Sequence, residues 1–72
     1  MLPDDGFEAE KNRYSADADG HFVDPNGRMA NISVEDTYGC SGEQIVNEIG
    51  RRNHLRFGPT MSLLLDWIAL NS

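Results

Sequence analysis

Two runs of apolar residues at helical spacing, both after residue 40, most constrain how this chain can fold. The first run predicts a short helix over about 42–49, because its apolar residues fall on one helical face. Ser41 and Gln44 have the spacing of a capping box at the helix start, and Gly50 is placed to end the helix. The apolar residues of this face are Ile45, Val46 and Ile49.

The second run predicts a helix over about 60–70, with Thr60 positioned to cap its first turn. Its wide apolar stripe comprises Met61, Leu64, Leu65, Trp67 and Ile68. The intervening stretch RRNHLRFGP is expected to be a connector that places Leu55 and Phe57 between the two helices. Two helices joined in this way can enclose one small core.

Before the helices, turn residues alternate with short β-prone runs and predict a hairpin over about 20–34. Its turn is expected at DPNG, where Pro25 fixes φ and Gly27 can adopt a positive φ. Phe22 and either Ile32 or Val34 are expected to face the helices. Because an isolated two-stranded hairpin is marginally stable in water, this one must pack on the helices.

The chain of 72 residues is long enough for one small domain, which we expect over 17–72. Residues 1–16 are rich in charge and poor in large apolar groups, so they are expected to form a flexible acidic arm. The same composition suits a leader or the end of a longer acidic linker. The sequence therefore predicts an α+β fold in which a small turn-rich hairpin packs on two short helices.

Charge and hydropathy exclude several classes of function. The net charge is −6, whereas nucleic-acid binding depends mainly on clustered lysine and arginine, so we expect no nucleic-acid partner. Residues 61–70, the strongest apolar stretch, are interrupted by Asp66 and too short to span a membrane. No signal peptide is recognisable, and the single cysteine cannot form an internal disulfide.

The acidic side chains Asp17, Asp19 and Asp24 are the best candidates for a cation site. Calcium prefers several carboxylate and carbonyl oxygens on a tightly turned loop. With Asp17 and Asp19 at the third and fifth positions of an EF-type loop, the backbone carbonyl of His21 supplies a further ligand. These four residues are therefore the expected calcium ligands.

The match to such a loop is incomplete. Ser15 stands at its first position in place of aspartate, and Asn26 at its twelfth in place of glutamate, so we expect weak calcium binding. The alternative is that DADG and DPNG are two polar turns that bound a strand, with solvated carboxylates.

A second group of candidates is basic. Arg51, Arg52 and Arg56 can bind a phosphate or an acidic partner, and the alternative is a solvated connector. Cys40 precedes a helix start, where a thiol pKa can be lowered, but no motif places His21 or His54 beside it as a base. We therefore expect Cys40 to be a half-buried small residue and the protein not to be an enzyme.

Three stretches, DADGHFVD, ISVEDTYGCSGEQIV and RFGPTMSLLLDWIAL, are similar to the C-terminal tails of secreted bacterial proteins with thrombospondin type 3-like calcium repeats. Those tails follow the pattern D-T-x-G-C-S-C-E-Q-I, then F-G-C-S, then D-W. The matching residues are Asp36, Thr37, Gly39, Cys40, Ser41, Glu43, Gln44, Ile45, Phe57, Gly58, Asp66 and Trp67. Cysteines of the pattern would fall at Gly42 and Pro59, and their joint absence here suggests that they pair in those proteins.

The resemblance implies a non-enzymatic extracellular terminal module with a structural, assembly or adhesion role, weak calcium binding and a protein partner. A different hypothesis is a small intracellular acidic protein that binds and inhibits a basic partner, as phage regulators and nucleic-acid mimics do. It is motivated by residues 1–48, which hold eleven acidic and three basic side chains. A third hypothesis, a thiol enzyme that uses Cys40 and His54, requires rapid alkylation of Cys40 at neutral pH.

Overall fold

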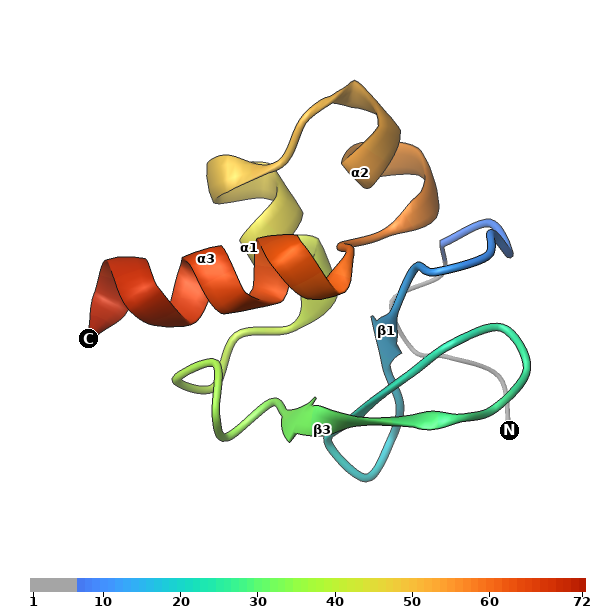
Figure 1. Cartoon of the computed structure of the whole chain (residues 1–72), viewed down its shortest axis with the longest axis horizontal. Helices are drawn as coiled ribbons and strands as arrows, with labels where there is room; N and C mark the ends of the chain where they lie inside the picture. The colour runs from blue at the N-terminus through green and yellow to red at the C-terminus, as the bar shows by residue number, and fades with distance from the viewer. Residues whose placement is uncertain (1–6) are drawn as a thin grey trace.

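The computed structural model describes residues 7–72, which form a three-stranded antiparallel sheet and three helices (Figure 1). The elements in chain order are β1 Ser15–Ala16, β2 His21–Val23, β3 Met29–Ser33, α1 Gly42–Ile49, α2 Arg52–Phe57 and α3 Met61–Asn71. The sheet lies on one side of the molecule and the helices lie on the other. This arrangement confirms the α+β class, with one more strand and one more helix than the sequence predicts.

Local capping sets the limits of α1 and α3. The Ser41 N–H donates to Gln44 Oε1 at 2.9 Å and the Gln44 N–H donates to Ser41 Oγ at 3.4 Å, which confirms the capping box. Thr60 caps α3 by accepting the Leu63 N–H at 3.2 Å. Gly50 ends α1 as expected, although its φ is −78° and not positive.

The connector predicted between these two helices contains a helix of its own, α2. Its start is fixed locally, because the Arg51 N–H donates to His54 Nδ1 at 2.9 Å. A helix of six residues is marginal alone and needs tertiary support, and here α2 lies against α1. Leu55 remains 54% exposed, so the expectation that it fills the space between two helices was wrong.

The predicted hairpin corresponds to β2 and β3, joined by the DPNG turn. Gly27 has a φ of 84°, and the backbone N–H groups of Gly27 and Asp24 donate to Asp24 O and Arg28 O, both at 2.9 Å. The pairing of β2 with β3 shifts register between His21 and Val23, so β3 bulges. A bulge makes an edge strand a poor template for further strand pairing.

Residues 7–16 differ from the flexible arm expected over residues 1–16, while residues 1–6 lie outside the described part of the chain. Ser15 and Ala16 form β1, which pairs with β2 and is buried. The Tyr14 N–H donates to Pro59 O at 2.9 Å, and Phe7 packs against the core. The expectation failed for residues 7–16 because these few apolar residues pack on distant segments of the chain.

The core lies between the sheet and the helices α1 and α3. Its buried residues are Ala16, Phe22, Ile32, Ile45, Val46, Leu63 and Leu64. Phe22 and Ile32 therefore face the helices as predicted. Helix α1 contacts α2, α3 and β1, so it connects the helical layer to the sheet.

Candidate binding face and helix-junction hollow

The four residues predicted to bind calcium lie in and beside two turns. Asp17 Oδ1 accepts the N–H groups of Asp19 and His21, each at 2.9 Å. Asp24 Oδ1 does the same for Asn26 at 3.0 Å and Arg28 at 2.9 Å. Within residues 7–72 no three acidic, histidine or cysteine side chains form a group that could hold a metal ion. The two carboxylates thus serve their own turns, as in the alternative interpretation of the sequence.

The turn at Asp17 changes the acidity of that residue. The hydrogen bond from the His21 N–H is the largest cause that lowers the pKa of Asp17 below its ordinary value of 3.8. The Asp19 N–H adds to the effect, since both donors stabilise the ionised carboxylate. Asp17 is therefore a charged turn residue at neutral pH.

The three predicted partner-binding arginines do not act as one group. Arg56 Nε donates to Glu8 Oε2 at 2.9 Å, and its guanidinium lies 4.9 Å from the centre of the Phe57 ring. Arg51 and Arg52 are exposed at the start of α2. Within residues 7–72 neither the Arg51 nor the Arg52 guanidinium has an ion pair or hydrogen bond, and of these two arginines Arg51 lines a hollow, so it is the better placed to meet a ligand.

Cys40 is a free, half-buried cysteine that packs against the core, as the sequence predicted. His54 lies in α2, where its Nδ1 accepts the Arg51 N–H. No hydrogen bond joins Cys40 to either histidine within the described residues.

Sequence reasoning missed the turn that follows β3. Thr37 is fully buried, and its hydroxyl lies 2.9 Å from Val34 O and 2.8 Å from Cys40 O, so its one proton can serve either carbonyl. The indole N–H of Trp67 donates to Thr37 O at 3.0 Å. These contacts fix the backbone on one side of Tyr38, which has a φ of 62°.

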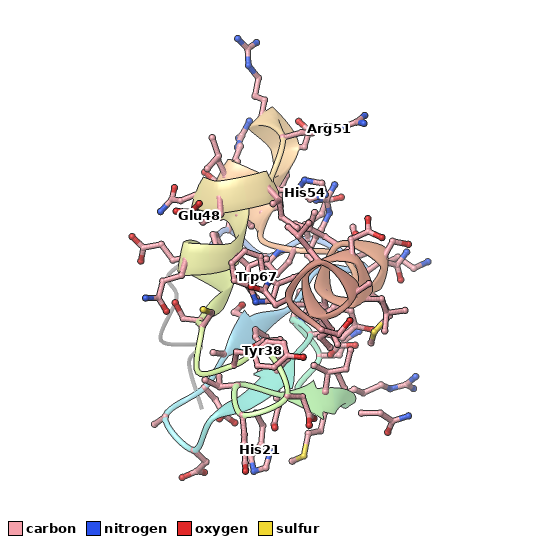
Figure 2. The ribbon with its side chains drawn as sticks, turned by 90° about the vertical axis from the view of Figure 1, so that its left-hand side faces the viewer. His21, Tyr38, Glu48, Arg51, His54 and Trp67 are labelled. Carbon is pink, nitrogen blue, oxygen red and sulfur yellow. The ribbon has the colours of Figure 1, made fainter. Side chains whose placement is uncertain are left out.

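Tyr38 and Trp67 form the centre of an end face of the molecule, which we call the Tyr38 face (Figure 2). Tyr38 is 55% exposed, whereas Trp67 is half-buried and packs against the core. Glu48 of α1 is labelled to the upper left of Trp67 in this view, and Glu35 belongs to the turn of Tyr38, whose N–H donates to Glu35 O at 3.1 Å. The face thus combines an exposed aromatic ring with neighbouring carboxylates.

Above Trp67 in Figure 2, the same end of the molecule continues to His54 and Arg51. There the end of α1, the start of α2 and one side of α3 line an open hollow of about 430 Å³, here called the helix-junction hollow. The lining residues that matter are Ile49, Arg51, His54, Leu63, Asp66 and Leu70. The hollow therefore combines apolar side chains with groups of both charges.

The environment of His54 is electropositive. Burial is the first cause that lowers its pKa below the ordinary value of 6.5, and the nearby charges of Arg13 and Arg51 act in the same direction. Because Nδ1 accepts the Arg51 N–H, the single proton of the neutral ring is on Nε2. His54 can therefore donate one hydrogen bond.

A further hollow of about 400 Å³ is lined by the N-terminal segment, the DPNG turn and Phe57. Its charged groups are already engaged. Arg13 Nη1 donates to Gly58 O at 3.1 Å, and Glu8 pairs with Arg56. The helix-junction hollow is the better candidate for a ligand, because the Arg51 guanidinium has no such partner within residues 7–72.

No helix within residues 7–72 is long and apolar enough to cross a membrane. The resemblance to the tails of proteins with calcium repeats stays a prediction. No family model matches the chain, and neither a curated protein nor a solved structure matches it.

Proposed function

We propose that this protein is a non-enzymatic binding module that docks a basic, partly apolar segment of a partner protein on the Tyr38 face. The observation that carries the proposal is the backbone of Tyr38, an exposed aromatic residue at a φ of 62°. A non-glycine residue in this region costs of order 1–3 kcal/mol, and such strain is concentrated at functional sites. An exposed ring adds little to the core, so a tyrosine at a strained backbone position favours a role in recognition.

The surroundings of Tyr38 support the same kind of partner. Tyrosine and tryptophan are enriched in protein interfaces because they offer a large rigid contact area with a polar end. Trp67 is anchored through its indole N–H to Thr37, so the face is preorganised. Glu35 and Asp36 belong to the turn of Tyr38, and Glu48 is labelled in the same view as Tyr38 in Figure 2. Their negative charge complements lysine and arginine in a partner.

The experiment is a selection of random peptides displayed through their C-termini, with the wild type and Tyr38→Asn as separate baits. Asparagine tolerates a positive φ, so Tyr38→Asn is expected to keep or raise the melting temperature while removing the ring. Wild-type protein should enrich peptides with lysine or arginine beside an apolar residue, and Tyr38→Asn should lose that enrichment.

The matched control is Met29→Asn, which removes another large exposed side chain, 62% exposed, from β3. This variant should enrich the same peptides as the wild type. Enrichment without a basic bias, or the same peptides from Tyr38→Asn, would contradict the proposal.

The calcium-binding and extracellular roles implied by the resemblance stay predictions. Calorimetric titration with calcium tests the first role. A rise in melting temperature that disappears in Asp17→Asn would support it, and no heat and no shift at millimolar calcium would contradict it.

A further inference from the structure

Two side chains that line the helix-junction hollow, Arg51 and His54, have hydrogen-bond donors for a ligand. The Arg51 guanidinium has no partner within residues 7–72, and the neutral ring of His54 keeps a donor at Nε2 because its Nδ1 is occupied. Arg51 and His54 come from the same end of α2, where the Arg51 backbone N–H donates to His54 Nδ1, and both residues line the hollow. Both are labelled above Trp67 in Figure 2. An arginine beside a neutral histidine is suited to a single carboxylate group.

The rest of the lining selects the ligand further. Ile49, Leu63 and Leu70 provide apolar surface, and Leu70 is 67% exposed. Asp66 adds a negative charge to the same hollow. Asp66 repels any anion, and it repels a doubly charged phosphate about twice as strongly as a singly charged carboxylate, so the hollow favours the singly charged group.

We propose that the helix-junction hollow binds a carboxylate attached to an apolar residue, as at the C-terminus of a partner segment. The proposal rests on the proposed function for its partner, a peptide segment that continues from the Tyr38 face. The carboxylate contacts Arg51 and His54, and the terminal side chain packs on Ile49, Leu63 and Leu70. Partner recognition then has two parts, basic residues at the Tyr38 face and a free C-terminus at the hollow.

The test uses N-acetyl-leucine as the probe and N-acetyl-leucinamide, its uncharged analogue, as the matched ligand. Nuclear magnetic resonance titration of the full chain measures both affinities from the shifts of residues in the hollow. We expect the acid to bind at least about tenfold more tightly than the amide, the difference that about 1.4 kcal/mol produces. Arg51→Gln should remove this preference, and Arg52→Gln, at the neighbouring exposed arginine, should keep it.

A second readout separates direct contact from a structural effect of the substitution. A bound anion favours the imidazolium form, so saturating N-acetyl-leucine should raise the pKa of His54 measured from its ring resonances. The amide should leave that pKa unchanged. Asp66→Asn should add binding of inorganic phosphate, which the wild type should reject.

Equal affinities for acid and amide would overturn the proposal, as would equal losses in Arg51→Gln and Arg52→Gln. An unchanged His54 pKa in the presence of bound acid would do the same. None of these outcomes affects the peptide selection at the Tyr38 face, because displayed peptides joined through their C-termini carry no free carboxylate there. The two proposals can therefore fail separately.

Discussion

Single residues decide where two backbone segments of this molecule can approach each other closely. Gly58 has a φ of 99°, and a Cβ at this position would lie 2.7 Å from Tyr14 O and 2.8 Å from Cδ2 of Phe7. Glycine is thus required twice, for the backbone conformation and for the close approach of the N-terminal segment. Tyr38 is the opposite case, because it has a positive φ without being glycine.

Gly58→Ala is expected to destabilise the protein by about 2 kcal/mol or more, because strain and collision add. Gly27→Ala is the matched control, since Gly27 has a φ of 84° but nothing within 4 Å of an added Cβ. Its loss should be about 1 kcal/mol, from backbone strain alone. Urea unfolding of both variants measures the two free energies, and equal losses would show that the contact with Tyr14 has no energetic weight.

Asp17 gives stability a defined dependence on pH. Because hydrogen bonds lower its pKa below 3.8 in the folded state, the unfolded chain binds the proton first as the pH falls. Its stabilising effect is therefore complete above about pH 3.8 and is lost as the pH falls through the lower folded pKa. Thermal unfolding between pH 2 and 5 should show a smaller acid loss in Asp17→Asn than in the wild type.

Asp19→Asn is the control for this experiment, because Asp19 contributes its backbone N–H to the turn and not its carboxylate. Its acid profile should follow that of the wild type. An Asp17→Asn profile that is parallel to the wild-type profile would mean that the turn does not stabilise the ionised carboxylate.

At the scale of elements, short hydrogen-bonded motifs define the ends of α1, α3 and the DPNG turn. The capping box of α1 joins Ser41 and Gln44, and the cap of α3 joins Thr60 and Leu63. Each pair is separated by three residues, so the sequence contains the complete motif. Helix α2 has no apolar stripe of comparable length, and its six residues depend on α1.

Ser41→Ala is expected to reduce the free energy of unfolding by about 1 kcal/mol, because the Gln44 N–H loses its acceptor. For a domain of this size that loss lowers the melting temperature by roughly 4–8 °C. Ser62→Ala is the control, since Ser62 lies one residue inside α3 and the capping acceptor there is Thr60. If Ser41→Ala melts at the same temperature as the wild type, the capping box does not stabilise α1.

At the scale of the whole molecule, the N-terminal segment closes the fold by joining the sheet to the connection between α2 and α3. Glu8 N–H donates to Arg56 O at 3.2 Å, and Tyr14 N–H donates to Pro59 O at 2.9 Å. β1 then adds a third strand beside β2. Three strands on a helical layer are more stable than an isolated pair, so residues 7–16 belong to the domain.

A chain of residues 17–72, the domain boundary expected from composition, should therefore be much less stable than a chain of residues 7–72. The shorter chain loses β1 and uncovers part of the apolar surface around Phe22 and Val23. Differential scanning calorimetry should show a lower unfolding temperature and a smaller unfolding enthalpy for the shorter chain. Equal unfolding temperatures and enthalpies for the two chains would mean that residues 7–16 do not stabilise the domain.

The features that could be derived from the sequence are those whose partners lie within about four residues. The caps at Ser41 and Thr60, the positive φ of Gly27 and the inward-facing Phe22 follow from spacing and residue type, since local hydrogen bonds and side-chain periodicity need no knowledge of the rest of the chain. Contacts between residues far apart in the sequence decide the rest of the fold and the candidate site. The hydrogen bond from Trp67 to Thr37 joins residues 30 apart, and that from Arg13 to Gly58 joins residues 45 apart. Such contacts hold residues 7–16 on the domain, orient Tyr38 and form the helix-junction hollow. The composition of either contacting segment alone does not encode them.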